Sequence, residues 1–198
     1  MITPPRPGHM EGVVLAAGSS LRAGTFKPGL MLGGKPMIER SIEGMREVCD
    51  RIIVVGGFAF GQLRGLLQPM PDVECVENPV YRLGMFTSVK AGLSCVRGER
   101  CFLLPADTPL VPARVYRALA ASDALISVPT FRGSRGHPVC LMASLIPAIL
   151  REPDTSSLRE FIHRTGSATV EVDAEEILLD IDTSEDYERM VQQLSGKA

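Results

Sequence analysis

The sequence predicts an α/β protein, a three-layer α/β/α sandwich around a mainly parallel, mixed sheet. Three observations support this class. Short apolar runs recur along the chain, and several are apolar at every position, as is typical of parallel strands buried on both faces. Amphipathic segments with helical spacing separate these runs. A loop of small residues, Leu15–Gly24, directly follows the first apolar run.

Seven apolar runs are predicted to form strands. The runs at Ile52–Val55 and Cys101–Leu104 are the clearest, because every residue in them is apolar. The predicted strands are Glu11–Ala16, Arg51–Gly56, Val73–Glu77, Cys101–Pro105, Ala124–Pro129, Pro138–Met142 and Ala168–Val172.

Three amphipathic helices are predicted between or after these strands. The first opens at Pro36, because proline suits the first helical position. The third follows Thr183–Asp186, whose pattern fits a capping box. The expected apolar faces are Ile38, Ile42, Met45 and Cys49 in the first helix; Met85, Val89, Leu93 and Val96 in the second; and Tyr187, Met190, Val191 and Leu194 in the third.

The segment Phe131–Pro138 interrupts the alternation of strands and helices. It joins two predicted strands with turn-forming residues and has no room for a helix, so we expect a hairpin or β-arm at the edge or mouth of the sheet. Without a linker, repeat or low-complexity tract, residues 11–198 are expected to form a single domain. Residues 1–10 are expected to be a disordered extension or a cloning remnant, with Met10 as a candidate start.

Composition narrows the functional class. The 198 residues are 45% hydrophobic and 22% charged with a net charge of −2, which argues against a nucleic-acid binder. Aromatic residues make up 5% and tryptophan is absent, so a base-stacking platform is not expected either. The five cysteines show no C-x-x-C spacing and indicate reduced, largely buried thiols of a cytoplasmic protein rather than a metal-thiolate site. No apolar stretch approaches the length of a membrane span, and no signal peptide is recognisable.

The loop Leu15–Gly24 is the strongest functional signal. Its small residues allow backbone N–H groups to approach an anion, and Arg22 and Lys27 can neutralise the charge, which points to a triphosphate. The alternative is an ordinary strand-to-helix turn. Neither the P-loop pattern nor the G-x-G-x-x-G dinucleotide pattern is present.

Two acidic positions are candidate magnesium ligands. Asp107 follows a strongly apolar strand, where ligands bind in open α/β sheets, and Mg²⁺ commonly takes one or two carboxylates together with phosphate oxygens. Asp182 could complete the site, and Asp180 would point the same way if the run is extended. The alternatives are a turn cap for Asp107 and a favourable helix-dipole contact for Asp182.

Two further turns have both functional and structural interpretations. Asn78 and Ser88 flank a turn that enters a helix, where free N–H groups and hydroxyls can bind a base, ribose or phosphate. Plain N-capping by Thr87 or Ser88 is the alternative. His137 has no identifiable nucleophile as a partner, which excludes a hydrolytic triad, and Asp154–Ser157 is expected first of all to cap a helix.

The motifs taken in order resemble a known family. L-A-A-G-x-S-x-R-x-G with a following lysine and G-G-K-P, then N-P and G-M-x-x-S, D-x-P-L-V, R-G-H-P and L-D-I-D-T-x-E-D, resembles the nucleotidyltransferases of molybdenum cofactor biosynthesis, the cytidylyltransferases in particular. The likeness runs from about Gly12 to the last predicted helix. The opening motif is shared by many sugar-nucleotide pyrophosphorylases, whereas R-G-H-P and L-D-I-D-T are more specific.

This resemblance implies a fold of the nucleotide-diphospho-sugar transferase type. It also implies transfer of CMP from CTP to the phosphate of a molybdopterin-type acceptor, with Mg²⁺ as cofactor, release of pyrophosphate, and a recipient molybdoenzyme or its chaperone as a partner. It implies catalytic roles for Arg22, Lys27 and Asp107, and metal binding by Asp107 and Asp182. The implied nucleotide-binding residues are Leu15, Ala16, Ala17, Gly18, Ser19, Ser20, Arg22, Gly24, Lys27, Asn78 and Ser88. The implied acceptor-binding residues are Arg135, Gly136, His137 and Pro138.

The base and the acceptor leave alternatives open. Ala17 stands where the related guanylyltransferases usually have glycine, which favours cytosine. Pro153–Ser157 lacks the G-D-x-G motif that the family has near the expected acceptor. The resemblance therefore supports the roles of the nucleotide-binding residues more directly than the identity of the acceptor. The alternatives are a GTP-dependent molybdopterin guanylyltransferase, a nucleotidyltransferase acting on a sugar or alditol phosphate, and a nucleotide-binding regulatory module without turnover.

Overall fold

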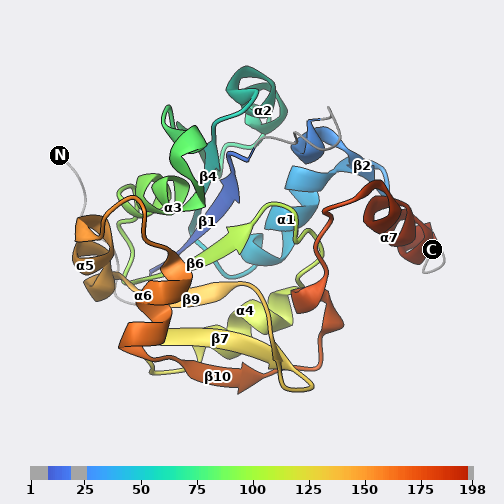
Figure 1. The fold of residues 1–198 in the computed structure, drawn as a ribbon. Coiled ribbons are helices and arrows are strands. Elements are labelled where there is room, and N and C mark those ends of the chain that lie inside the picture. Colours follow the sequence, from blue (N-terminus) through green and yellow to red (C-terminus); the bar gives the residue numbers. More distant parts are fainter. Residues whose placement is uncertain (1–8, 19–25, 196–198) are drawn as a thin grey trace.

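The computed structural model describes residues 9–18 and 26–195, and an eight-stranded sheet forms its centre (Figure 1). The strands lie in the order β10-β7-β9-β6-β1-β4-β5, and β8 pairs with β7. Their bounds are β1 (Met10–Ala16), β4 (Arg51–Gly56), β5 (Val73–Glu77), β6 (Arg100–Pro105), β7 (Ile126–Phe131), β8 (Ser134–Arg135), β9 (Val139–Met142) and β10 (Ala168–Glu171). A separate two-stranded sheet consists of β2 (Met31–Leu32) and β3 (Lys35–Pro36).

The sheet is mixed, as the sequence predicts. Strand β1 is parallel to both β4 and β6, and β4 is parallel to β5, whereas β9 is antiparallel to β6 and β7. The chain passes from β1 to β4 and β5 on one side and then returns to place β6 on the other side of β1. The strand order therefore reverses between β1 and β6, and ligands bind at such switch points, outside the carboxyl ends of the strands.

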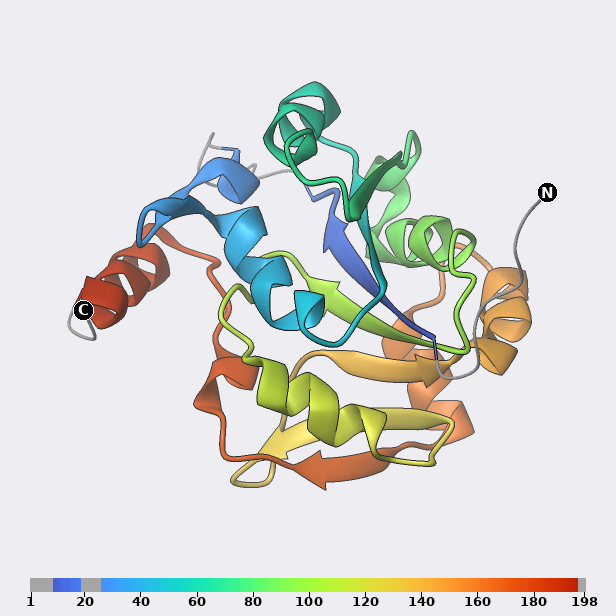
Figure 2. The same cartoon turned by 180° about the vertical axis from the view of Figure 1, so that it is seen from behind.

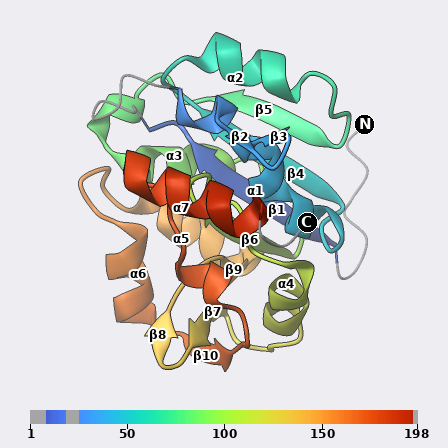
Figure 3. The same ribbon diagram turned by 90° about the vertical axis from the view of Figure 1, so that its right-hand side faces the viewer.

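Helices cover both faces of the sheet, and the predicted three-layer sandwich is confirmed (Figures 2 and 3). One face packs against α1 (Met37–Arg46), α2 (Phe60–Leu67) and α4 (Ala113–Ala120), and the other against α3 (Met85–Leu93), α5 (Ile146–Arg151) and α6 (Leu158–Thr165). We call the core on the face of α1, α2 and α4 the first core, and the core on the face of α3, α5 and α6 the second core. Neighbouring residues of β1 point to opposite faces, so Val14 belongs to the first core and Val13 to the second. Both side chains are fully buried.

The last helix, α7 (Ser184–Ser195), closes the chain beside the small sheet (Figure 3). Met190 of α7 packs with Leu32, Met37 and Ile181 in a third buried cluster. The predicted capping box is confirmed, because Asp186 N donates to Thr183 Oγ1 at 3.2 Å and Thr183 N donates to Asp186 Oδ2 at 2.9 Å. The third buried cluster anchors the loop that precedes α7, through Ile181, against Met37 at the start of α1.

Two helix predictions need correction. Pro36 is not the first residue of a helix: it ends β3 and serves as the N-cap of α1, with an extended backbone (φ −56°, ψ 144°). Met85, expected on an apolar face, begins α3 but is 67% exposed, because it lies at the first turn, beyond the part of the helix that covers the sheet. Val89 and Leu93 of the expected face are buried in the second core, whereas Val96 lies beyond the end of α3 and is only partly buried. In the same way, Cys49 of the first expected face lies beyond the end of α1.

The predicted hairpin at Phe131–Pro138 is confirmed. Strands β7 and β8 are antiparallel and pair Phe131 with Ser134, which leaves a two-residue turn. Both turn residues have positive φ, 50° at Arg132 and 81° at Gly133, as tight hairpin turns require. Four short 3₁₀ helices complete the described elements: Lys27–Gly29, Tyr81–Leu83, Ala143–Leu145 and Glu175–Leu178. Within the described ranges, every helix is too short or too polar to cross a membrane.

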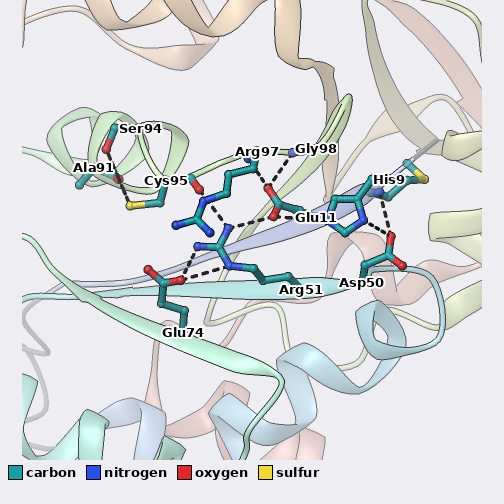
Figure 4. A network of polar contacts seen from close by, with 11 residues as sticks. His9, Glu11, Asp50, Arg51, Glu74, Ala91, Ser94, Cys95, Arg97 and Gly98 are labelled. Carbon is teal, nitrogen blue, oxygen red and sulfur yellow. Dashed lines mark hydrogen bonds and ion pairs between the residues drawn. The ribbon is translucent and has the colours of Figure 1, made fainter. Parts of the chain in front are cut away.

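A buried ionic network fixes the amino-terminal edge of the sheet, opposite the switch point (Figure 4). Glu11 is fully buried; its carboxylate accepts hydrogen bonds from Arg97 N at 2.6 Å and Gly98 N at 3.1 Å, and pairs with Arg51 Nη1 at 2.9 Å. Burial by itself raises the pKa of Glu11, but the two backbone donors and Arg51 outweigh burial and hold that pKa below its usual value. The network therefore keeps a buried charge fully compensated.

Candidate functional site

A cavity of about 690 Å³ opens where the strand order reverses; we call it the switch-point cavity. It lies at the carboxyl ends of β1 and β6 and is bounded by the residues that begin α1 and α3. The switch-point cavity is lined by many of the residues that the sequence indicates for nucleotide or metal binding. These are Leu15, Ala16, Ala17, Gly18, Lys27, Ser88, Asp107 and Asp182. Residues far apart in the chain thus meet in one place.

Backbone hydrogen bonds hold the floor of this cavity. Ala106 N donates to Leu15 O at 3.0 Å, which ties the end of β6 to the end of β1. Phe58 N donates to Ala17 O at 3.2 Å from the other side. The buried Ser41 hydroxyl lies 2.7 Å from Ala106 O and so attaches α1 to the same loop. The turn at Leu15–Gly18 is therefore held on both sides before any ligand is present.

Lys27 lies between the two candidate carboxylates. Its Nζ donates to Ile181 O at 2.9 Å and lies 3.4 Å from Asp182 Oδ1. Ile181 N in turn donates to Asp107 O at 2.9 Å, so the loop before α7 is joined to the loop after β6. Lys27, Asp107 and Asp182 are thus gathered by main-chain contacts as well as by charge.

The carboxyl group of Asp107 is destabilised in its charged form. Burial is the largest cause and raises its pKa; Lys27 acts in the opposite direction, and Asp182 and Asp180 add further repulsion that raises it again. The net effect is a raised pKa. A partly buried carboxylate repelled by a second, exposed carboxylate is an arrangement that a divalent cation would stabilise.

The two candidate donors suit a hard divalent cation. Asp107 and Asp182 both line the cavity, while the neighbouring Asp180 does not. Among the described residues, no group of three or more histidine, cysteine or acidic side chains is gathered closely enough to form a metal site made of protein ligands alone. Two carboxylates beside an open cavity would suit a hard divalent cation whose shell is completed by phosphates and waters.

The turn at Asn78 is built differently from the predicted N-cap. Asn78 is 2% exposed and does not line the cavity; its amide donates to Thr87 Oγ1 at 2.8 Å and to Ser88 Oγ at 2.9 Å. The N-cap of α3 is Gly84, with φ of 126°, so neither Thr87 nor Ser88 caps the helix. Asn78 therefore positions Ser88, which reaches the cavity.

Four residues at the mouth of the cavity are not expected from the sequence: Phe58, Tyr81, Arg82 and Met85. They come from the turn after β4 and from the 3₁₀ helix and first turn of α3 after β5. Arg82 Nε donates to Tyr81 Oη at 3.3 Å, and its guanidinium carbon lies 5.8 Å from the centre of that ring. The sequence signal for this group is the position of these turns after two predicted parallel strands.

A second cavity, of about 770 Å³, adjoins the first; we call it the arm cavity because the β7–β8 hairpin contributes to it. The two cavities share Leu15, Met85 and Pro105 as walls. Arg135, Gly136 and His137 line the arm cavity, whereas Pro138 is buried and does not. Three of the four expected acceptor residues therefore surround a cavity next to the switch point.

The hairpin residues have structural as well as lining roles. Gly136 passes so close to the backbone of Ile177 that a Cβ added there would lie 2.3 Å from Ile177 O. His137 N donates to the same carbonyl at 2.9 Å, and the His137–Pro138 peptide is cis. The imidazole Nδ1 of His137 is buried and has no hydrogen-bond partner among the described residues. Burial lowers the pKa of His137, against an opposing effect of Asp180.

The segment that departs from the resembled family, Pro153–Ser157, begins the far wall of the arm cavity. Its expected role as a helix cap is confirmed: Glu160 N donates to Ser157 Oγ at 3.1 Å, and Ser157 N donates to Glu160 Oε2 at 3.1 Å. Sequence reasoning missed Arg159 and His163, which follow on α6 and also line this cavity. The expected site residues Ser19, Ser20, Arg22 and Gly24 lie outside the described residues.

A mixed sheet of this order, with a cavity where the order reverses, is the fold of the nucleotide-diphospho-sugar transferases. Within that class the chain belongs to the family described as "MobA-like NTP transferase domain", whose sequence model matches residues 12–170. The protein is therefore a nucleotidyltransferase by family.

Two relatives illustrate this membership, and one solved structure illustrates the shared fold. The molybdenum cofactor cytidylyltransferase of Escherichia coli is 30% identical over 180 residues, which cover 90% of this chain and 93% of that protein. The molybdenum cofactor guanylyltransferase of Rhizobium meliloti is 30% identical over 185 residues, covering 83% and 81%. The crystal structure of Rv0371C from Mycobacterium tuberculosis in complex with manganese superposes with a TM-score of 0.74 at 24% identity, covering 93% of this chain and 98% of that one.

Proposed function

We propose that the protein transfers CMP from CTP to the phosphate of a molybdopterin-type acceptor, with release of pyrophosphate, in molybdenum cofactor biosynthesis. The observation that carries the proposal is the meeting of Lys27, Asp107 and Asp182 in a cavity that shares a wall with a second cavity. Two anionic substrates that must react need two adjoining sites and a surplus of compensating charge at the junction.

The switch-point cavity is proposed to hold the nucleotide. The turn Leu15–Gly18 presents its backbone to the ligand, and a Cβ added at Gly18 would meet no atom of the described residues within 4 Å, so the approach is open. Lys27 faces the phosphates, and Ser88, held by Asn78, contributes a hydroxyl. Ser19, Ser20, Arg22 and Gly24 are assigned to the same nucleotide by the family resemblance alone.

Asp107 and Asp182 are proposed to hold Mg²⁺, which would supply positive charge to the phosphates of the bound nucleotide. Lys27 Nζ lies 3.4 Å from Oδ1 of Asp182, so the second oxygen of this carboxylate could contact the cation. The hydrogen bond from Lys27 to the Ile181 carbonyl would hold the ammonium group beside the phosphates. The charge of Asp107, raised in energy by burial, favours cation binding.

The proposed reaction is an in-line displacement at the α-phosphorus of CTP. An oxygen of the acceptor phosphate forms a new P–O bond there, the bond to the bridging oxygen of the β-phosphate breaks, and pyrophosphate leaves with that electron pair. The acceptor phosphate is already ionised at pH 7, so no residue needs to remove a proton. The chain contributes orientation and charge compensation, chiefly through Lys27 and the turn at Leu15–Gly18.

The arm cavity is proposed to hold the acceptor. Arg135, Gly136 and His137 line it, and Pro138 fixes the path of the chain behind them. The choice of cytosine rests on two observations. Ala17, which is 3% exposed, lines the cavity, and a cytidylyltransferase is 30% identical over 90% of the chain. A guanylyltransferase activity is the second candidate, because a guanylyltransferase is similar at the same 30% identity. We place the reaction in the cytoplasm, with a molybdoenzyme or its chaperone as recipient of the product.

The test is pyrophosphate release by the full chain with Mg²⁺, CTP or GTP, and a molybdopterin-type or sugar phosphate acceptor. We expect release with CTP and the molybdopterin-type acceptor, and a loss of about 100-fold in turnover for Lys27→Ala, as for other preorganised electrostatic groups. Lys35→Ala is the matched control, since Lys35 pairs with Glu39 and Glu43 and does not line the cavity. Nucleotide binding without pyrophosphate release, or full activity of Lys27→Ala, would overturn the proposal.

A further inference from the structure

We propose that Asn78 is a positioning residue that fixes the Ser88 hydroxyl as a hydrogen-bond donor toward the nucleoside half of the bound nucleotide. The inference rests on the proposed function and deepens it, because it assigns the kind of ligand atom that Ser88 binds. That atom is an oxygen or an unprotonated ring nitrogen that accepts a hydrogen bond. A ligand without such an atom would leave the hydroxyl proton without an acceptor.

Main-chain contacts fix Asn78 and the orientation of its side-chain amide. Asn78 follows β5, and its backbone N–H donates to Gly56 O, at the end of β4, at 2.8 Å. Val80 N donates to Asn78 Oδ1 at 3.1 Å, so the amide oxygen faces Val80 and the NH₂ group faces α3. Asn78 is 2% exposed, so water does not compete for these hydrogen bonds.

The two hydrogens of this NH₂ group serve two neighbouring hydroxyls of α3. Asn78 Nδ2 lies 2.8 Å from Thr87 Oγ1 and 2.9 Å from Ser88 Oγ, so each hydroxyl oxygen accepts one hydrogen bond. An amide NH₂ group donates and does not accept. Neither hydroxyl can therefore give its own proton to Asn78 Nδ2.

The protons of the two hydroxyls have different destinations. Thr87 Oγ1 donates to Gly84 O at 2.8 Å, and Thr87 lines neither cavity. Ser88 is 3% exposed and lines the switch-point cavity, and within residues 9–18 and 26–195 its hydroxyl makes no other hydrogen bond than the one from Asn78. A buried O–H group without an acceptor is unfavourable, so a ligand in this cavity is stabilised if it supplies one.

The elements that carry the lining residues indicate which part of the nucleotide meets Ser88. The 3₁₀ helix that begins at Lys27 packs against α1 and α2, on the face of the first core, and Lys27 contacts Asp182 there. Ser88 belongs to α3, which covers the opposite face. Arg82 is also on the α3 side, but it is exposed at the mouth of the cavity, whereas Ser88 is buried. With the phosphates at Lys27, the nucleoside half lies at Ser88.

The test measures the binding of CTP and of inorganic tripolyphosphate, each with Mg²⁺, to the full chain by isothermal titration calorimetry. We expect Ser88→Ala to weaken CTP binding by about fivefold, as loss of one hydrogen bond does, and to leave tripolyphosphate binding unchanged. Asn78→Asp replaces the amide donor by an oxygen that accepts the Ser88 proton and turns it away from the cavity. Asn78→Asp should weaken CTP binding by the same factor, and Ser88→Ala added to it should cause no further loss.

Thr87→Val is the matched control, because Thr87 shares the Asn78 amide but lines neither cavity, and it should keep the wild-type affinity for CTP. Equal weakening of CTP and tripolyphosphate binding, unchanged CTP binding in Ser88→Ala, or a loss in Thr87→Val as large as that in Ser88→Ala would overturn the inference. Additive losses from Ser88→Ala and Asn78→Asp would overturn the role of Asn78. Far-ultraviolet circular dichroism checks that each variant is folded, and if Asn78→Asp does not fold, the comparison of Ser88→Ala with Thr87→Val still decides the matter.

The outcome is separable from that of the proposed function, because these binding measurements need no acceptor substrate. CTP binding that depends on Ser88, with no pyrophosphate release from any acceptor, would support the role of this hydroxyl and refute the transfer reaction. Pyrophosphate release together with CTP binding that is unaffected by Ser88→Ala would do the reverse.

Discussion

Replacing Asp107 by Asn should stabilise the ligand-free protein while abolishing its response to metal and nucleotide. The fold raises the pKa of Asp107, chiefly through burial, so the charged carboxylate is less favourable in the native state than in the unfolded chain. A group whose native pKa lies above its unfolded pKa contributes stability at low pH and loses that contribution as the pH rises through the native value. At pH 7 the ionised side chain therefore costs free energy, which Asn of nearly the same shape does not.

The size of this effect follows from linkage. Each pKa unit of upward shift corresponds to about 1.4 kcal/mol of unfavourable free energy at pH 7. For a chain of this length, 1 kcal/mol corresponds to a change in Tm of about 2–4 °C. We therefore expect Asp107→Asn to raise the ligand-free Tm at pH 7, by about 3–6 °C for each unit by which the fold raises this pKa. The difference should shrink as the pH is lowered through the raised native pKa of the carboxyl group.

The assay is differential scanning fluorimetry with and without Mg²⁺ and CTP. A ligand present at about 100 times its Kd stabilises the native state by about 2.7 kcal/mol, so the wild-type Tm should rise clearly and that of Asp107→Asn should not. Asp180→Asn is the control, because Asp180 does not line the switch-point cavity, and it should keep the ligand-induced rise. A ligand-free Tm below that of the wild type, or an undiminished rise with Mg²⁺ and CTP, would refute the reasoning.

Two other predictions concern stability. Glu11→Gln should cost about 3 kcal/mol at pH 7, because it leaves Arg51 and the N–H groups of Arg97 and Gly98 poorly compensated. Since the native pKa of Glu11 is lowered, the difference should disappear as urea unfolding is repeated at pH values falling below 4.5, and a constant difference would contradict the assignment. Ser157→Ala should lower the free energy of unfolding by about 1 kcal/mol through loss of the capping hydrogen bond to Glu160, measured by urea denaturation, and no change would contradict that role.

The sheet can be predicted well because its strands are signalled locally. The predicted bounds of β4 and β5 match the structure, since each is a short run bordered by turn residues. The prediction for Pro36 is wrong because proline is also compatible with the residue just before a helix, and the small β2–β3 sheet decides between the two. Local propensity does not contain that tertiary contact.

The site residues that can be predicted from the sequence are charged residues that lie beside a recognisable motif or strand end. Lys27, Asp107 and Asp182 can be identified because each is a charged residue beside a recognisable motif, and the structure brings them to one cavity. Arg82 has only the general signal of following a predicted parallel strand, and Arg159 has none, because it is an ordinary arginine of α6 whose position depends on how that helix packs across the sheet. Their assignment to a cavity requires the tertiary structure.

The wall that the two cavities share has a consequence for the end of the catalytic cycle. A dinucleotide product made from both substrates would extend over Leu15, Met85 and Pro105 and occupy both chambers at once. Each half would then keep the other at high local concentration, so the product would dissociate more slowly than either substrate. On the proposed function, an enzyme built in this way holds its finished cofactor until another macromolecule takes it over, and the product need not pass freely through solution.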